Sequence, residues 1–137
     1  MTDNVFLDTN VLIYAHSLGD HRIDKAQQLL FDSGVINTQV LNEFASNLRG
    51  KLGFSWEEVS LAVEKILILC PNPKALTVET HLRALELTQK YKFSLSDSLI
   101  IAAALEARCT TLYTEDLQHG QIIEGLRIEN PFLEARN

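Results

Sequence analysis

Short apolar runs and longer amphipathic stretches alternate along the chain. Runs of three or four apolar residues between turn-forming residues are typical of short buried strands. They predict strands at 4–7, 35–37 and 110–113, a weakly signalled strand at 75–77, and a short edge strand at 126–128. Because strands that alternate with helices usually form a parallel sheet covered on both faces, the pattern predicts an α/β fold with a mainly parallel sheet.

The stretches between these strands have apolar residues three and four positions apart, which predicts helices. The expected helices cover 22–32, 39–48, 78–90 and 97–107, together with a short helix that starts near Asn10. Another helix should follow Ser55 and Glu58, which form a capping box ahead of an apolar stripe that reaches Leu69. Thr38 can cap the helix at 39–48. The helix at 97–107 is almost entirely apolar, so we expect it to be central in the fold.

Length and composition change this picture little. The chain has 137 residues, 46% hydrophobic and 22% charged, which suits one globular domain. It has no run of 18 apolar residues and no basic leader, so we expect neither a membrane span nor a signal peptide. Cys70 and Cys109 have no close Cys or His partner, so the pattern favours free thiols in a cytoplasmic protein. A net charge of −6 argues against a protein that coats nucleic acid nonspecifically.

Acidic residues follow two of the predicted strands. Asp8 directly follows the first strand, and Asp116 follows the strand at 110–113. In open parallel sheets, ligands bind beyond the carboxyl ends of the strands, so both acids belong to the functional edge. Asp97 opens the central helix, and Glu43 lies on the helix that follows the second strand. Spacing alone does not establish that the four acids converge.

Each acid also has a purely structural interpretation. Asp8 could cap the short helix near Asn10, and Asp97 could complement a helix dipole. Asp116 could lie in a turn, and Glu43 on a solvated helix face. Taken together, however, converging carboxylates would repel one another unless a cation joined them. Oxygen ligands suit Mg²⁺ or Mn²⁺, which promote phosphodiester cleavage. The histidines are scattered, which disfavours a histidine metal site.

Four segments in register carry a family resemblance: "VFLDTNVLIYA", "VLNEF", "FSLSDSLIIAAAL" and "LYTEDLQHG". In this order, and with the ending "GLRIENPF", the chain resembles the PIN-domain ribonucleases, and among these the VapC-type toxins of toxin–antitoxin pairs. The resemblance implies a single domain over 1–137, folded as a three-layer α/β/α sandwich with about five short strands. It also implies an Mg²⁺- or Mn²⁺-dependent endoribonuclease that hydrolyses phosphodiesters with a metal-activated water.

The resemblance also implies roles for individual residues. The family's acidic positions, which would be both metal ligands and catalytic residues, correspond to Asp8, Glu43, Asp97 and Asp116. Small polar residues that support the metal ligands correspond to Thr9, Asn10 and Thr114. Glu115 stands beside Asp116, so which of the two carboxylates takes the fourth acidic role stays open.

The expected partners are an RNA substrate, a cognate antitoxin and a second copy of the chain, with no membrane. Basic residues should line the rim of the acidic site, because RNA is a polyanion. The candidates are Arg49, Lys51, Lys90 and Lys92. An equally supported interpretation is that these basic residues only complement the dipole at a helix C-terminus.

Other classes of protein fit the sequence less well. Phosphatases with an acid at the end of the first strand need a second Asp two residues later, where this chain has Asn10. The sequence lacks the set of acidic residues and a lysine that is typical of a phospho-acceptor domain. It also has no glycine-rich phosphate-binding motif. Two alternatives stay open: a PIN-like module that binds RNA or protein without catalysis, and an RNA-processing nuclease that is not a toxin.

Overall fold

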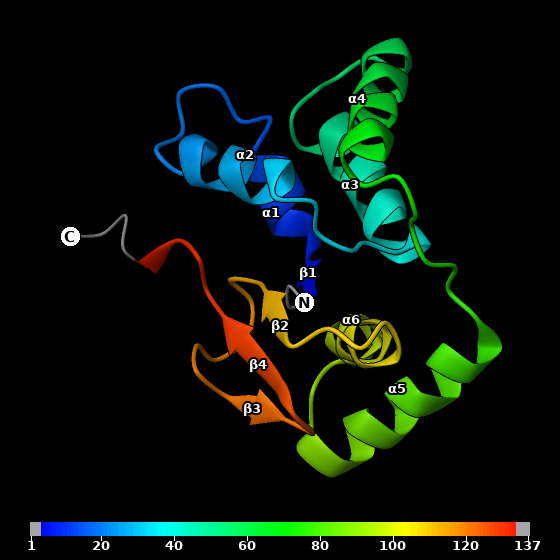
Figure 1. Ribbon diagram of the computed structural model, residues 1–137. Helices are drawn as coiled ribbons and strands as arrows, with labels where there is room; N and C mark the ends of the chain where they lie inside the picture. The colour runs from blue at the N-terminus through cyan, green and yellow to red at the C-terminus, as the bar shows by residue number, and fades with distance from the viewer. Residues whose placement is uncertain (1–3, 134–137) are drawn as a thin grey trace.

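A computed structural model describes residues 4–133 of the chain. It has one sheet with the strand order β1-β2-β4-β3 (Figure 1). The strands are β1 (Val5–Leu7), β2 (Thr111–Tyr113), β3 (Ile122–Ile123) and β4 (Leu126–Glu129). β1, β2 and β4 run parallel, and β3 pairs with β4 in an antiparallel hairpin. The prediction of an α/β fold with a mainly parallel sheet is therefore confirmed.

In the described part of the chain, six helices surround this sheet: α1 (Thr9–Tyr14), α2 (Ile23–Phe31), α3 (Thr38–Gly50), α4 (Trp56–Leu69), α5 (Val78–Tyr91) and α6 (Leu95–Glu106). They form two groups. In the first group, α1 packs against α2 and α3, and α3 packs against α4. In the second group, α5 packs against α6, which contacts β2 (Figure 1). The predicted capping box of Ser55 and Glu58 begins α4. Within residues 4–133, no helix is long and apolar enough to cross a membrane.

Three strand predictions and one cap prediction are wrong. The segment at 35–37 forms two single-residue bridges rather than a continuous strand, because Val35 pairs with Phe6 and Asn37 pairs with Lys74 of a different segment. Asn37, rather than Thr38, caps α3. The segment at 75–77 is not a strand, since Thr77 caps α5 by accepting a hydrogen bond from Thr80 N. The strand at 126–128 is not an edge, because β3 covers its outer side.

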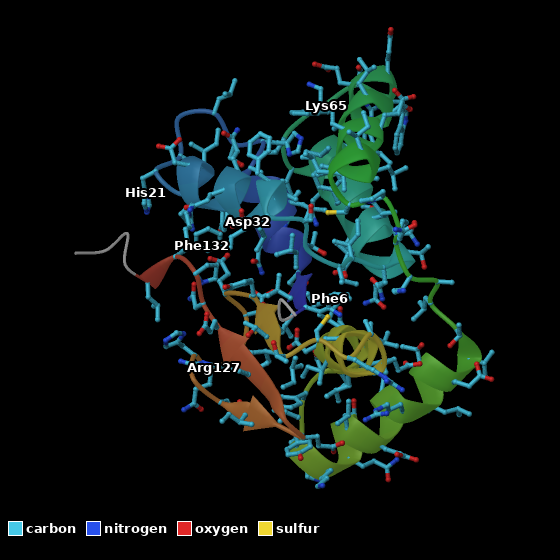
Figure 2. All side chains as sticks on the ribbon, in the orientation of Figure 1. Phe6, His21, Asp32, Lys65, Arg127 and Phe132 are labelled. Carbon is cyan, nitrogen blue, oxygen red and sulfur yellow. The ribbon has the colours of Figure 1, made fainter. Side chains whose placement is uncertain are left out.

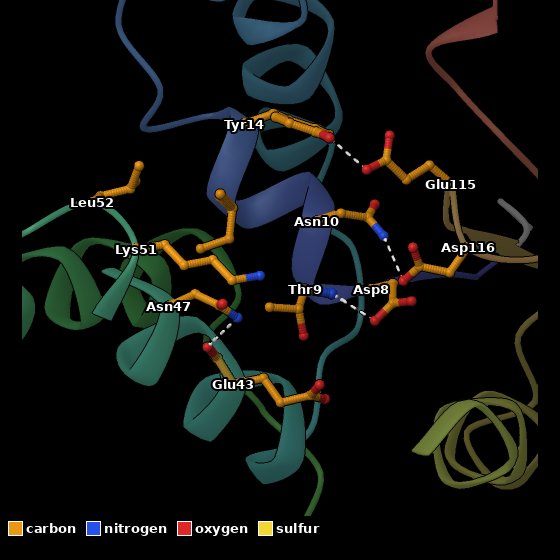
Figure 3. Close-up of a pocket in the computed structure, with 11 residues that line it drawn as sticks. Asp8, Thr9, Asn10, Tyr14, Glu43, Asn47, Lys51, Leu52, Glu115 and Asp116 are labelled. Atoms are coloured by element: carbon orange, nitrogen blue, oxygen red, sulfur yellow. Dashed lines mark hydrogen bonds between the residues drawn. The ribbon is translucent and has the colours of Figure 1, made fainter. Parts of the chain in front are cut away.

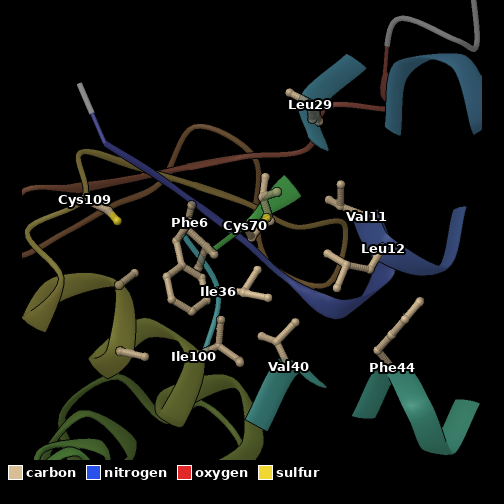
Figure 4. Close-up of a cluster of buried hydrophobic side chains, with 14 of the residues drawn as sticks. Phe6, Val11, Leu12, Leu29, Ile36, Val40, Phe44, Cys70, Ile100 and Cys109 are labelled. Atoms are coloured by element: carbon tan, nitrogen blue, oxygen red, sulfur yellow. The ribbon is translucent and has the colours of Figure 1, made fainter. Parts of the chain in front are cut away.

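The core explains why α6 carries no polar stripe. Every residue of α6 from Ser98 to Ala104 is buried, since α6 lies between the sheet and α5. Phe6 of β1 lies in a buried cluster with Ile100 of α6 and Val40 of α3 (Figure 4), and the next residue, Leu7, is also fully buried. Charged side chains such as Lys65 and Arg127 point away from this interior (Figure 2). Burial on both sides fixes the end of β1, where the predicted site begins.

Candidate functional site

The register of two parallel strands places Asp8 beside Thr114. Leu7 of β1 pairs with Tyr113 of β2, so the next residue of each strand leaves the sheet at the same edge. Asp8 N donates to Tyr113 O at 3.1 Å, and Thr114 Oγ1 donates to Asp8 Oδ2 at 2.8 Å. Thr114 is fully buried. The sheet itself therefore joins two residues that are 106 positions apart in the sequence.

Asp8 caps a helix and is buried as well. Its Oδ1 accepts a hydrogen bond from Thr9 N at 2.7 Å at the start of α1, so the capping interpretation is right. Only 6% of its surface is exposed. Burial, together with the nearby charges of Asp116 and Glu43, raises the pKa of Asp8 to about 6 despite these hydrogen bonds. Because burial of a carboxylate costs free energy that a solvated cap avoids, capping alone does not account for this position.

Asp116 belongs to the same network of hydrogen bonds. Its backbone N donates to Thr114 Oγ1 at 3.1 Å, and its Oδ2 accepts from Asn10 Nδ2 at 3.3 Å (Figure 3). Asn10 Nδ2 also lies 3.4 Å from Thr114 Oγ1, while its buried Oδ1 has no hydrogen-bond partner in the part of the chain that the structure describes. The polar residues beside the acids therefore join Asp8 to Asp116.

Glu43 faces this network from α3. Its carboxylate is half-buried, and burial raises its pKa, as do the charges of Asp116 and Asp97. The Thr9 hydroxyl points toward Glu43 (Figure 3) without completing a hydrogen bond. A second helix thus brings a third carboxylate to the strand ends, because α3 packs directly on α1.

Asp97 lies at the margin of this group. It is in the first turn of α6, where its backbone N donates to Ser94 Oγ at 3.1 Å, so Ser94 rather than Asp97 caps the helix. Partial burial raises the pKa of Asp97, and the charge of Asp116 adds to this shift. Asp97 does not line the cleft that contains the other three acids. It therefore shares their electrostatic field from beside the cleft.

The cleft has a volume of about 410 Å³ and combines acidic, amide and apolar walls (Figure 3). Its lining residues are Asp8, Thr9, Asn10, Ile13, Tyr14, Glu43, Asn47, Lys51, Leu52, Glu115 and Asp116. Sequence reasoning missed Tyr14 and Asn47, although each lies four residues after a predicted site residue, Asn10 or Glu43. Residues at this spacing share a helix face, which is the signal that could have found them.

The surroundings of Glu115 differ from those of Asp116. Tyr14 Oη donates a short hydrogen bond to Glu115 Oε1, and Arg22 forms an ion pair with Glu115 Oε2 at 3.7 Å. Asp116 instead shares hydrogen bonds with Asn10 and Thr114, beside Asp8. The two neighbouring carboxylates therefore belong to separate networks.

Of the four candidate RNA contacts, Lys51 lines the cleft. Arg49 lies 5.2 Å from the ring centre of Trp56 and donates to Phe54 O at 3.1 Å. Lys90 forms an ion pair with Glu124 at 3.7 Å, and Lys92 ends α5 in the left-handed conformation. The structure thus gives Arg49, Lys90 and Lys92 places outside the cleft.

The donor set agrees with a hard divalent cation. The cleft offers carboxylate, hydroxyl and amide oxygens, and among residues 4–133 no three Asp, Glu, His or Cys side chains are grouped closely enough to enclose an ion. Mg²⁺ retains several waters and binds through one or two carboxylates, so it needs no closed cage. The raised pKa of buried Asp8 and the unpaired Asn10 Oδ1 mark positions that a cation would stabilise.

A comparison with known protein families identifies the family of this chain. Residues 5–123 match the PIN domain, and the chain belongs to the PIN-domain family. A comparison with curated protein sequences finds no match.

Solved structures with the same fold include VapC20 of Mycobacterium tuberculosis, a sarcin–ricin-loop-cleaving toxin. It is 19% identical with a TM-score of 0.68, over 82% of this chain and 90% of that one. A toxin–antitoxin complex from Klebsiella pneumoniae is 23% identical with a TM-score of 0.69, over 93% and 97% of the two chains. VapBC2 from Rickettsia felis, bound to a DNA fragment from its promoter, is 20% identical with a TM-score of 0.68, over 91% and 96%.

Proposed function

We propose that this protein is an Mg²⁺- or Mn²⁺-dependent endoribonuclease. One observation carries the proposal: Thr114 and Asn10 join buried Asp8 to Asp116 at the carboxyl ends of β1 and β2, and Glu43 faces them across a cleft. Three acids in one cleft, with Asp97 at its margin, suit a cation that meets a phosphodiester better than they suit direct contact with a polyanion.

Different residues of this chain would have different roles in the proposed RNA cleavage. Asp8, Glu43, Asp97 and Asp116 would hold the cation, either directly or through water. When bound, the cation would activate a water and stabilise negative charge on the phosphoryl oxygens. Asn10 and Thr114 orient Asp116, and the Thr9 N–H orients Asp8. Lys51 supplies a positive charge inside the cleft for a substrate phosphate.

Cleavage of RNA tests this proposal. Purified protein should cleave a labelled RNA in Mg²⁺ or Mn²⁺ and stop when EDTA is added. Asp97→Asn should lower the cleavage rate roughly 100-fold or more, because a charged group of the metal site is lost. Asp24→Asn is a matched control, since Asp24 is an exposed acid in the first turn of another helix, α2.

The outcomes separate the open alternatives. Equal cleavage rates for wild type and Asp97→Asn would contradict the assignment of Asp97. RNA binding without cleavage by the wild type would instead favour the noncatalytic PIN-like module.

We further propose that the protein is the toxin of a toxin–antitoxin pair. Its fold is shared with the toxin VapC20 and with two toxin–antitoxin proteins. An acidic cleft also suits a basic side chain from an antitoxin, because Arg binds carboxylates with two parallel hydrogen bonds. Expression of the protein alone should stop growth of a host cell, and coexpression with a cognate partner should restore growth. Harmless expression of folded, RNA-cleaving protein would favour the RNA-processing alternative.

We also propose that the protein is a homodimer in the cytoplasm. Val78, Leu82 and Leu85 share one face of α5 and stay exposed, by 71%, 56% and 39%, which supports a self-association surface. Cys70 and Cys109 are free and buried, as suits a reducing compartment. Light scattering on the purified protein measures the oligomeric state directly.

A further inference from the structure

The cleft is larger and more varied than a metal site requires. Its volume of about 410 Å³ lies in the range of about 300–1,000 Å³ that is typical of small-molecule pockets. Asp8 and Asp116 lie at one end, and Leu52 lies across the cleft from them (Figure 3). Ile13 and Tyr14 also line the cleft, and the Tyr14 hydroxyl points toward Glu115 (Figure 3). The cation and a phosphate would account for the acidic lining and leave the apolar lining without an occupant.

The ring of Tyr14, which lines the cleft, is held in one orientation. The Arg22 guanidinium lies 3.8 Å from the Tyr14 ring centre, and the Phe132 ring meets it edge-on at 5.0 Å. The Tyr14 hydroxyl donates to Glu115 and accepts from Arg22 Nη1 at 2.8 Å. Arg22 is itself fixed by two hydrogen bonds to Asp20, from Nε at 2.9 Å and from Nη2 at 2.7 Å. A ligand that contacts this ring therefore has little side-chain entropy to overcome.

Polar groups lie between the two ends. Lys51 extends its ammonium group into the cleft between Leu52 and the acids (Figure 3). Asn47 lines the same wall, where its Nδ2 donates to Glu43 O at 2.8 Å and leaves its carbonyl oxygen available as an acceptor. The acids and Lys51 can therefore hold a phosphate with its cation, the Asn47 carbonyl oxygen can accept from a ribose hydroxyl, and the apolar side chains can contact a base. The lining thus offers a partner to each of the three parts of a nucleotide.

We infer that Ile13, Tyr14 and Leu52 form a subsite for one unpaired nucleobase of the RNA, next to the phosphodiester at the acidic end. The inference rests on the proposed function and adds to it the side chains that contact a base beside the cut. Unpaired bases can be splayed out to contact aromatic and apolar side chains, whereas bases inside an A-form helix are inaccessible to them. The cleft therefore selects a loop, bulge or single strand.

An abasic scan tests the subsite in cleavage. A single-stranded RNA that the protein cleaves is resynthesised with an abasic ribose at one position at a time. One position next to the cut should lower kcat/KM about fivefold or more, and the other positions should have smaller effects. In Leu52→Ala and Tyr14→Leu this penalty should largely disappear, because the base contact is already lost. Leu61→Ala, which removes an exposed leucine of α4 outside the cleft, should keep the full penalty.

Tyr14→Phe separates contact with the base from support of Glu115. It keeps the ring but removes the hydroxyl that donates to Glu115. A base contact predicts that Tyr14→Phe keeps the abasic penalty and the KM of the wild type. A fall in kcat with no change in the penalty for both Tyr14→Phe and Tyr14→Leu would overturn the subsite and leave Tyr14 as support for the acidic loop.

A binding experiment gives a readout independent of cleavage. Methyl NMR signals of Ile13 and Leu52 should shift on addition of 5′-UMP or 5′-AMP in Mg²⁺, but not on addition of ribose 5-phosphate. Equal shifts with ribose 5-phosphate, or shifts with a basic peptide and none with a nucleotide, would overturn the inference. Absence of RNA cleavage together with these base-dependent shifts would contradict the proposed function alone and keep the nucleobase subsite.

Discussion

At the scale of single residues, Asp8 couples the protein's stability to its proposed chemistry. Its carboxylate is removed from water and lies near the charges of Asp116 and Glu43, which together raise its pKa from 3.8 to about 6. Between these two values the folded protein holds a proton that the unfolded chain has already lost. The stability contributed by this group is therefore present below about pH 4 and falls as the pH rises toward 6.

Metal-free wild-type protein should lose about 3 kcal/mol of unfolding free energy from Asp8 across that window. Asp8→Asn cannot titrate and keeps an acceptor for Thr9 N, so its stability should fall less over the same range. Urea unfolding in EDTA at several pH values measures both proteins. Parallel pH profiles for wild type and variant would contradict the buried, repelled state of Asp8.

The fourth acidic role is the second question at this scale. Asp116→Asn should lower metal-dependent cleavage at least about tenfold, because Asp116 shares the network that contains Asp8. Glu115→Gln should cleave at close to the wild-type rate, since the amide oxygen of the new side chain can still accept from the Tyr14 hydroxyl. Cleavage rates at saturating Mn²⁺ distinguish the two, and the reverse order of effects would assign the role to Glu115.

At the scale of elements, Gly34, which lies between α2 and α3, packs closely against β1. A Cβ atom on Gly34 would lie only 2.4 Å from Leu7 Cγ, and Leu7 is fully buried directly before Asp8. Gly34→Ala should therefore destabilise the fold by about 1–3 kcal/mol through overpacking. Gly50→Ala is the control, because a Cβ there meets no atom within 4 Å. Thermal unfolding measures both, and equal melting temperatures for the two variants would contradict the close approach.

The C-terminal end of α3 supplies the second prediction at this scale. Lys51 ends α3 inside the cleft, whereas Arg49 lies against Trp56. Lys51→Ala should weaken single-stranded RNA binding and reduce the slope of log K against log salt by about 0.7. Arg49→Ala should leave that slope near the wild-type value. A salt series by fluorescence anisotropy tests this, and equal slopes for Lys51→Ala and wild type would remove Lys51 from the RNA contact.

At the scale of the whole molecule, the sequence predicted elements better than it predicted contacts between them. The helices were identified by their apolar spacing, and Asp8 and Asp116 by their position after strands. The prediction of a strand at 75–77 was wrong because Thr77 caps α5 through a local hydrogen bond, which the apolar pattern does not reveal. The separation of Glu115 from Asp116 depends on Tyr14 and Arg22, which only the folded chain brings to them.

The convergence of the acids also could not be predicted from residue spacing in the sequence. It depends on the register of β1 with β2 and on the packing of α1 against α3, and neither is local. The resemblance to PIN-domain proteins supplied the expectation of convergence, and the structure places Asp8, Glu43 and Asp116 in one cleft with Asp97 at its margin.

The central claim is that these acids together bind a divalent cation, and calorimetric titration with Mn²⁺ tests it most directly. Wild-type protein should show one saturable binding process, and the exposed-acid control Asp24→Asn should show the same affinity. Asp8→Asn should bind at least about tenfold more weakly, because it lacks the buried charge at the centre of the site. Equal Mn²⁺ affinity in wild type and Asp8→Asn, or no saturable heat in the wild type, would contradict the metal site.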